Sequence, residues 1–279
     1  MTLSKDYWLG AWALLAAATA FAAPAMPPHL QPADQLDYRD YLEAPDHRAF
    51  AIAPGGAWGW SAGEPSAEAA EAKALGDCSG HTEQQCVAYA VDGRVVFDQK
   101  AWTTLWGPYA DARSARNRRS GTTRGDRFPD LALSDAKGKP TSVASLAGKV
   151  VFLHFWGTWC PPCRRELPEL NRLHAAMADR ADVAFVLVQV REKFQVARGW
   201  LRREGLSLPL YDSGALGEQD TAFRLAGGGS IADRRVASRF PTTYVLDKRG
   251  LVVFSHVGPV ADWRQFEPFL RHTAGGSGK

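Results

Sequence analysis

The sequence predicts an α/β sandwich, with a central mixed sheet flanked by helices, preceded by a small α+β domain. Two apolar runs, KVVFLHFW at 149–156 and VAFVLVQV at 183–190, are nearly continuous, as in strands that are buried on both faces. A helical pattern lies between them, a second follows, and the segments TTYVLD and GLVVFSHVG then form a hairpin before a last helix. This order of elements is typical of a mixed sheet covered by helices.

Length and composition allow this architecture and exclude some functions. The chain has 279 residues, enough for one large domain or two modest ones, and is 46% hydrophobic and 23% charged. Its formal net charge of +3 is too small to indicate a nucleic-acid partner.

The amino-terminal residues predict a targeting segment. Lys5 gives a weak positive start, which Asp6 partly offsets, and an apolar run follows from residue 7 to residue 25. Ala20-Phe21-Ala22 fits the A-x-A cleavage pattern, so we expect residues 1–22 to be a signal peptide and the protein to be periplasmic. An uncleaved anchor, with association to the inner membrane, stays open because the run approaches the length that spans a bilayer.

The first folded block is expected at residues 34–110. RAFAIA and AWGWS have the pattern of short strands, and PSAEAAEAKALGDC has helical spacing with an expected end near Gly76. CVAYAVDGRVVFD predicts two strands joined by an Asp92-Gly93 turn. A small α+β domain of this size is marginally stable without a crosslink.

Two of the four cysteines, Cys78 and Cys86, lie in this block. An even number of cysteines in an exported chain is compatible with two disulfides, so we expect a structural disulfide between Cys78 and Cys86. Closing this loop should stabilise the fold by about 2–3 kcal/mol. A redox relay that exchanges with Cys160, or a metal site that includes His81, are the alternatives.

Residues 111–127 predict a boundary. They lack large apolar side chains and contain six arginines against two aspartates, which indicates a solvated basic linker or a basic patch for a partner or an anionic lipid surface. The main domain is expected at 128–274 and a flexible tail at 275–279. Within the main domain, Leu167, Leu170, Leu173 and Met177 have helical spacing, and further helices are expected at QVARGWLRREG and ADWRQFEPFLRHTA.

The segment FWGTWCPPC at 155–163 carries the chemistry. Cys160 and Cys163 follow a buried strand and begin a helix, where free amide groups and the helix dipole stabilise a thiolate. Pro161 and Pro162 are tolerated there because first-turn N–H groups have no helical acceptor. A reactive dithiol is therefore the leading interpretation.

Other roles for this pair are weaker. A structural zinc site needs four ligands, and no second C-x-x-C exists. A haem attachment needs His after the second cysteine, where Arg164 stands. An inert crosslink stays open, although so short a loop constrains little chain entropy. We therefore expect no metal and no cofactor.

The stretches FPDLALSDAKGKPTSVASLAGKVVFLHFWGTWCPPCRRELPEL and FPTTYVLDKRGLVVFSHVGP resemble the thioredoxin superfamily, and most closely its exported TlpA/ResA/DsbE-type thiol–disulfide oxidoreductases. The resemblance covers residues 126–274 and implies a thioredoxin-like sandwich. The N-terminal half only faintly resembles a small exported paired-Cys domain of unknown function, which implies no activity.

The resemblance assigns roles to individual residues. Cys160 matches the exposed nucleophile and Cys163 the buried resolving thiol. Trp159 matches the aromatic side chain beside the pair, with a plain core tryptophan as the alternative. Pro241 matches the cis-proline that lies against the dithiol and lets neighbouring backbone pair with substrate.

Two titratable residues are further candidates. Glu166 follows Cys163 by three residues on one helix face, and the resemblance implies that it exchanges protons with the thiols. His154 stands where thioredoxins place a buried acid, and a neutral imidazole there could accept the Cys163 proton. A solvated glutamate and a hydrogen-bonded core histidine are the alternatives. Residues 222–240 also depart from the family in being longer and richer in glycine.

These observations predict a periplasmic thiol–disulfide oxidoreductase that acts on protein disulfide or dithiol substrates with an upstream redox partner. A redox-responsive adaptor, in which the N-terminal block recognises a partner, is the first alternative. A thiol peroxidase is the second, although the sequence before Cys160 lacks the Thr-x-x-Cys arrangement of peroxiredoxins. The motif does not indicate whether the protein reduces or oxidises its substrate.

Overall fold

The computed structural model describes residues 25–276 of the chain. The expected signal peptide at 1–22 and residues 277–279 of the expected tail lie outside this range. Within the described part, no helix combines the length and the apolar composition that crossing a bilayer requires.

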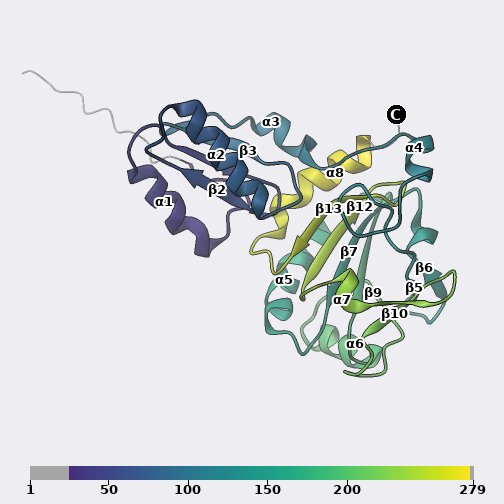
Figure 1. Cartoon of the computed structure of the whole chain (residues 1–279). Coiled ribbons are helices and arrows are strands. Elements are labelled where there is room, and N and C mark those ends of the chain that lie inside the picture. Colours follow the sequence, from purple (N-terminus) through teal and green to yellow (C-terminus); the bar gives the residue numbers. More distant parts are fainter. Residues whose placement is uncertain (1–24, 277–279) are drawn as a thin grey trace, which may run out of the picture.

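The C-terminal half is built on a five-stranded mixed sheet, as predicted. Its strand order is β13-β12-β7-β8-β9 (Figure 1). The strands are β7 (Val150–Trp156), β8 (Val183–Gln189), β9 (Leu210–Tyr211), β12 (Thr242–Leu246) and β13 (Val252–Val257). β7, β8 and β9 run parallel, whereas β12 is antiparallel to both β7 and β13. β7 therefore lies at the centre of the sheet and β13 at an edge.

Alternate residues of β7 pack on opposite faces, which explains its unbroken apolar run. Phe152 and Trp156 belong to a core that includes α5 (Pro161–Ala176), α6 (Phe194–Arg203) and α8 (Glu267–Gly276). Leu153 and Phe155 pack on the other face against residues 128–143 and 223–237. Both faces of β7 are buried, so each of its side chains must be apolar or hydrogen-bonded inside the protein.

Short elements complete this half. The second face carries β5 (Ala132–Ser134), β6 (Pro140–Ser142), η3 (Ala144–Leu146), β10 (Ala222–Arg224), β11 (Ser230–Ala232) and α7 (Asp233–Val236). The 3-10 turn η4 (Trp263–Phe266) packs in the core of the first face. The glycine-rich segment at 222–240 thus forms the β10–β11 hairpin and α7. The expected terminal helix begins as η4 and continues as α8.

The N-terminal half is a four-stranded antiparallel sheet covered by a helix. The sheet has the order β2-β1-β3-β4, with β1 (Ala49–Ile52), β2 (Trp58–Ser61), β3 (Val87–Val91) and β4 (Arg94–Val95). α2 (Ala67–Gly80) packs closely on it, since a Cβ at Gly59 would lie 2.4 Å from the Cys78 nitrogen. η1 (Pro32–Asp34), α1 (Gln35–Glu43), α3 (Gln99–Trp102) and η2 (Thr103–Leu105) complete this half.

The expected end of α2 near Gly76 is wrong. The helix continues to Gly80, and Gly76 is absent from the residues with positive φ, so it keeps a right-handed helical backbone. Glycine lowers helix stability by about 1 kcal/mol relative to alanine, which the packing of Ala70, Ala74 and Cys78 outweighs here.

One core joins the two halves. Trp106 stacks on Phe254 of β13 with ring centroids 5.0 Å apart and lies 4.9 Å from Phe269 of α8. Trp102 meets Phe269 edge-on at 5.5 Å, and His29 stacks on Phe266 at 4.2 Å. The same buried cluster extends to Phe152 and α5 in the C-terminal half. α8 accordingly lies between the two halves (Figure 1).

Residues 111–127, which we expect to be a basic linker, lie along the edge strand of the main sheet. They contain α4 (Ala112–Arg116), capped by Asp111, whose side chain accepts from the backbone nitrogens of Arg113 and Ser114. Gly125 N donates to Val252 O at 2.7 Å, and Val252 N donates to Asp126 O at 2.9 Å. The domain boundaries at 34–110 and 128–274 stay a prediction.

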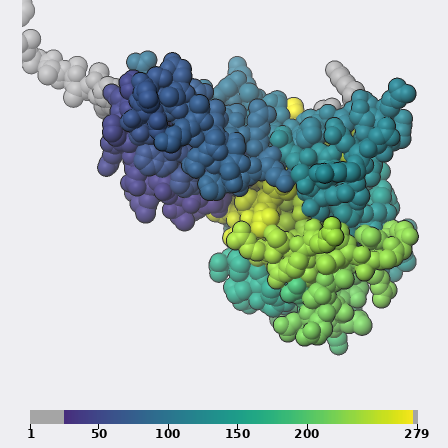
Figure 2. All heavy atoms as spheres, in the orientation of Figure 1, coloured from purple at the N-terminus to yellow at the C-terminus, as the bar shows by residue number. Residues whose placement is uncertain are grey.

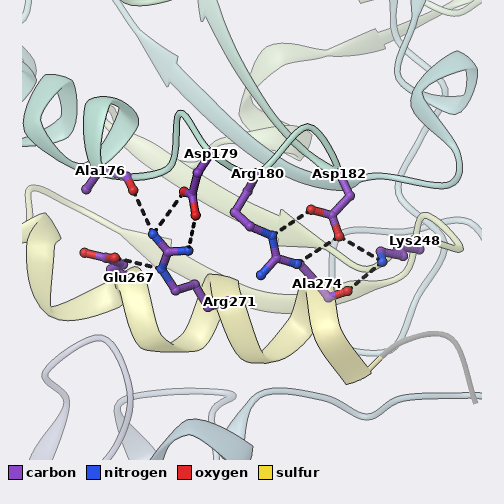
Figure 3. Close-up of polar contacts among 8 residues, drawn as sticks. All are labelled: Ala176, Asp179, Arg180, Asp182, Lys248, Glu267, Arg271 and Ala274. Carbon is purple, nitrogen blue, oxygen red and sulfur yellow. Dashed lines mark hydrogen bonds and ion pairs between the residues drawn. The ribbon is translucent and has the colours of Figure 1, made fainter.

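Polar contacts hold α8 against the C-terminal half (Figure 3). Arg271 donates to both carboxylate oxygens of Asp179, to the carbonyl of Ala176 and to Glu267 on its own helix. A second group follows near the end of the helix, where Lys248 contacts both Ala274 O and the Asp182 carboxylate. These contacts fix the element on which both halves pack.

Candidate active site

Cys160 and Cys163 lie where β7 meets α5. Cys160 is the N-cap of α5, and its sulfur accepts from the backbone nitrogen of Cys163 at 3.3 Å. Pro161 and Pro162 occupy the first helical turn, as expected for residues without an N–H. The two sulfurs form a disulfide, with Cα atoms 5.3 Å apart.

The loop before β12 covers this disulfide. The carbonyl oxygen of Phe240 lies 3.6 Å from Cys160 Sγ, and the peptide bond between Phe240 and Pro241 is cis. Cys160, which the resemblance implies is exposed, is only 4% exposed in this disulfide form, and Cys163 is fully buried. The Phe240-Pro241 loop is the physical reason, because it packs over the outer sulfur.

Trp159 stands on the open side of the pair. Its side chain is 45% exposed, and its ring meets Phe240 edge-on at 5.6 Å. The indole nitrogen donates to Val190 O at 2.9 Å, just beyond the end of β8. Trp159 is thus a partly exposed side chain anchored at one end rather than a core tryptophan.

Glu166 and His154 form a buried polar pair beneath this site. Glu166 lies on α5 and is 3% exposed, and His154 lies on β7 and is fully buried. His154 Nε2 is 3.5 Å from Glu166 Oε1, and its Nδ1 is 2.9 Å from the hydroxyl oxygen of Thr243 on β12. Glu166 Oε2 accepts from Val260 N and from the Trp263 indole nitrogen, at 2.9 and 3.0 Å.

Burial moves the pKa values of these two groups in opposite directions. It raises the pKa of Glu166 to about 8, although hydrogen bonds from Val260 and Trp263 oppose this shift. It lowers the pKa of His154 to about 3. At neutral pH the pair therefore contains a protonated carboxyl and a neutral imidazole, and its total charge is zero. Glu166 also lines, with Gln31 and Val260, a small surface cavity of about 210 Å³.

A second buried carboxyl at this edge of the sheet was not expected from the sequence. Glu192, 8% exposed, accepts from the Thr158 backbone nitrogen at 2.8 Å and from the Thr158 hydroxyl. Burial raises its pKa. The signal was available, because Glu192 follows β8 closely and the carboxyl ends of neighbouring parallel strands lie at one edge of a sheet.

The Gly-rich segment also contacts this edge. Asp233, at the start of α7, accepts from Arg191 at 2.6 and 3.1 Å, and Arg191 directly precedes Glu192. Arg191 and Arg234 lie over the ring of Phe240, at 6.0 and 5.2 Å from its centroid. The loop that covers Cys160 is therefore held from the side by Arg191, which follows β8, and by Arg234 of the glycine-rich segment.

The other cysteine pair is separate from this site. Cys78 and Cys86 form a disulfide with Cα atoms 6.2 Å apart, between the end of α2 and the start of β3. Cys78 packs in a small alanine-rich cluster of the N-terminal half, whereas Cys160 and Cys163 belong to the main core. Among residues 25–276, no group of three or more histidine, cysteine, aspartate or glutamate side chains is placed to hold a metal ion.

The sequence of the C-terminal half matches a known protein family. Residues 123–267 match the family model described as Redoxin. The chain is 33% identical over 139 residues to the thioredoxin-like protein YneN of Bacillus subtilis. This alignment covers 50% of this chain and 74% of YneN. It is 34% identical to the thiol-disulfide oxidoreductase ResA of Geobacillus thermodenitrificans over 46% of this chain and 66% of that one.

A solved structure is also similar to the C-terminal half. The thiol:disulfide interchange protein of the thioredoxin family from Chlorobium tepidum is 27% identical, with a TM-score of 0.40, and the match covers 55% of this chain and 99% of that one. The Redoxin match begins at residue 123, so it does not extend to the N-terminal sheet.

Proposed function

Because this chain belongs to the Redoxin family and is a thioredoxin-like oxidoreductase, we propose that it exchanges disulfides with protein substrates through Cys160 and Cys163. One observation carries this proposal. Cys160 caps the N-terminus of α5 beside the Phe240-Pro241 loop, with the sulfur of Cys163 bonded behind it. Free amide groups at a helix N-terminus favour the thiolate that such exchange requires.

In the reducing direction, the Cys160 thiolate attacks one sulfur of a substrate disulfide. A mixed disulfide forms, the substrate S–S bond breaks, and the other substrate sulfur leaves as a thiolate that takes up a proton. Cys163 then loses its proton and attacks Cys160, which forms the intramolecular disulfide and releases the second substrate thiol. Two electrons pass from the protein dithiol to the substrate, and the oxidising direction reverses each step.

We propose that the buried pair of Glu166 and His154 accepts the proton that Cys163 loses. Glu166 follows Cys163 by one helical turn, and its raised pKa of about 8 lets the carboxyl take and return a proton around pH 8. His154 orients it, because the imidazole is held by Thr243 on one side and faces Glu166 on the other. His154 would be a positioning residue and Glu166 the group that exchanges protons.

The compartment is part of the proposal. We place the protein in the periplasm, free or anchored to the inner membrane through its amino-terminal apolar run. The Cys78–Cys86 disulfide supports this location, since disulfides persist in oxidising compartments. An upstream redox partner would then return Cys160 and Cys163 to the starting state.

The test is turnover of a protein disulfide. With dithiothreitol as the electron donor, Cys160→Ala should abolish the reduction of insulin that the protein catalyses. Cys163→Ser should accumulate mixed disulfides with substrate proteins that nonreducing electrophoresis resolves. Unchanged turnover in Cys160→Ala would show that another group performs the exchange.

A further inference from the structure

A cleft of about 700 Å³ lies between the two halves, on the side of the main sheet that ends in β13. Asp34, Gly80 and Glu83 line it from the N-terminal half, and Arg239, Ser255 and Pro259 line it from the C-terminal half. Figure 2 shows this face hollowed where the blue N-terminal half, the blue-green segment that follows it and the yellow-green C-terminal strands meet. Its volume falls within the usual range of about 300–1,000 Å³ for ligand sites.

Two residues of the cleft wall adjoin the loop that covers the disulfide. Arg239, in its wall, directly precedes Phe240, whose carbonyl oxygen lies 3.6 Å from Cys160 Sγ. Gly258, also in the wall, donates its backbone N–H to Pro241 O at 2.9 Å. A polypeptide that presents a sulfur to Cys160 can therefore continue past this loop into the cleft.

One wall of the cleft is the edge of a sheet. β13 pairs with β12 on one side. On the other side, the backbone of Val252 and Val253 is bonded to Gly107, Gly125 and Asp126. Residues 255–257 line the cleft beyond this cover, and Val257 is 38% exposed. An extended polypeptide is the chemical class that fits an uncovered edge strand, because it can continue the sheet through main-chain hydrogen bonds.

The opposite wall carries two carboxylates, and the Arg124 guanidinium donates to the backbone oxygen of Glu83 at 3.4 Å. Asp34 and the exposed Glu83 are its carboxylates, and the histidine there, His81, lies 3.7 Å from Asp77, outside the cleft. Glu83 is held in place, since its Oε2 accepts from Arg124 N at 3.0 Å. Arg239 lies at the end nearest to Cys160. A cationic side chain on the bound segment would be complementary to the wall that faces away from the reactive sulfur.

We propose that this cleft binds an extended, cysteine-containing segment of the protein substrate, with basic side chains of that segment facing Asp34 and Glu83. The inference rests on the proposed function and adds the recognition site. The N-terminal half thereby becomes a substrate-binding module, whose disulfide-closed loop between Cys78 and Cys86 forms part of the wall.

Two glycines of α2 give a matched test. A Cβ at Gly80 or at Gly76 would meet no atom within 4 Å, and neither residue has a positive φ, but only Gly80 lines the cleft. Gly80→Trp should lower kcat/KM for insulin at least about tenfold and leave the reaction with 5,5′-dithiobis(2-nitrobenzoate) unchanged. Gly76→Trp should leave both unchanged. Equal activity of Gly80→Trp and Gly76→Trp toward insulin would overturn the proposal.

The charge of the segment is tested with two synthetic peptides, each with one cysteine activated by 2-nitro-5-thiobenzoate and flanked by lysines or by glutamates. The reduced protein should release the chromophore several-fold faster from the lysine peptide at low salt. Asp34→Asn/Glu83→Gln should remove this preference. Equal rates for both peptides with the unaltered protein would overturn the assignment of a basic segment.

The two proposals fail in different ways. If the unaltered protein reduces neither insulin nor the aromatic disulfide, the proposed function is wrong. If the unaltered protein reduces both but Gly80→Trp does not lower the activity toward insulin relative to that toward the aromatic disulfide, only the cleft assignment is wrong. Should Gly80→Trp not fold, hydrogen exchange of Cys163→Ser joined to the lysine peptide decides: protection at residues 80–83 and 255–259 supports the cleft, and its absence overturns it.

Discussion

At the scale of single residues, the pair formed by His154 and Glu166 departs most from a uniform apolar core. Neither His154 Nε2 nor Glu166 Oε1 has a hydrogen-bond partner, although they face each other at 3.5 Å. A buried carboxyl that lacks a full set of partners is costly to ionise, and the low local dielectric strengthens every interaction with the nearby thiols. The Glu166 carboxyl is therefore favourable in the fold when it is protonated, and its ionisation lowers the stability of the fold.

The first prediction concerns Glu166→Gln. The folded-state pKa of about 8 lies above the ordinary value of 4.5 for a glutamate, so the stability that this group contributes is complete below about pH 4.5 and is lost as the pH rises through 8. Glutamine cannot ionise. The variant should lie within about 1 kcal/mol of the unaltered protein in urea unfolding at pH 5 and exceed it at pH 9 by up to about 5 kcal/mol, at roughly 1.4 kcal/mol per pH unit between the two pKa values.

The same variant should change the kinetics. If Glu166 accepts the Cys163 proton, resolution of a mixed disulfide should accelerate around pH 8 in the unaltered protein and lose that step in Glu166→Gln. If Glu166→Gln and the unaltered protein had the same pH dependence of stability and the same pH dependence of resolution, neither the raised pKa of Glu166 nor its role as proton acceptor would hold. On the acid side, burial lowers the pKa of His154 and also those of His29 and His256, so stability should fall below about pH 6.5 in both proteins.

The second prediction concerns Cys78 and Cys86. Their disulfide closes a loop with a sequence separation of 8, so Cys78→Ala/Cys86→Ala should lower the free energy of unfolding by about 2–3 kcal/mol. The measurement is urea unfolding without reductant, because a reductant would also open Cys160–Cys163. A double variant as stable as the unaltered protein would show that neighbouring contacts already hold the loop.

At the scale of elements, α8 is held by charged contacts at its solvent side as well as by its apolar face. Arg271 makes two hydrogen bonds to the Asp179 carboxylate and one to Ala176 O (Figure 3). Two parallel bonds from one guanidinium to one carboxylate are stronger than a single exposed contact. Arg264 instead pairs with Asp262, two residues away, and with Glu169 at 3.4 Å.

The third prediction compares these two arginines. Arg271→Ala should lower the urea midpoint, because it removes the paired bonds between α8 and the segment that follows α5. Arg264→Ala, with 61% of the side chain exposed, should lower the midpoint less. Urea midpoints at low and high salt measure both. A loss in Arg264→Ala as large as that in Arg271→Ala would contradict this ranking.

The sequence predicted the elements whose pattern is long and locally determined. β7 and β8 follow from apolar runs, α5 from its leucine spacing, and the turn at Asp92-Gly93 from its residue types, with Asp92 and Gly93 both at positive φ. α1 and the short strands β9, β10 and β11 were not predicted. The three strands have only two or three residues each, too few to show a pattern, and depend on tertiary contacts, as when Phe223 of β10 packs on Phe155.

The site could be predicted in part for the same reason. The positions of Cys160, Cys163 and Pro241 are marked by motifs in the sequence. The cover of Cys160 by Phe240, the contact of Glu166 with Trp263, and the contact of Glu192 with Thr158 depend on residues distant along the chain. The cleft beside β13 needs both halves in place, so no local pattern indicates it.

At the scale of the whole molecule, the apolar core does not follow the limits of the family match. The match covers residues 123–267, whereas Trp102 and Trp106 before it and Phe269 after it belong to one buried cluster with Phe152 and Leu167. Tyr109 adds a hydrogen bond to the hydroxyl of Thr273 at 2.9 Å. A surface of this kind resembles the inside of one domain more than a contact between independent domains.

The fourth prediction follows from this shared core. Trp106 is 2% exposed and stacks between β13 and α8, so Trp106→Ala should destabilise the protein by about 3–5 kcal/mol. Urea unfolding should show a single transition in both proteins, with coincident curves from tryptophan fluorescence and far-ultraviolet circular dichroism. Trp159→Ala, at a side chain that is 45% exposed, is the matched control and should change stability by less than about 1 kcal/mol. Two separate transitions in the unaltered protein would show that the halves unfold independently, and the cleft between them would then lack the fixed walls that substrate recognition requires.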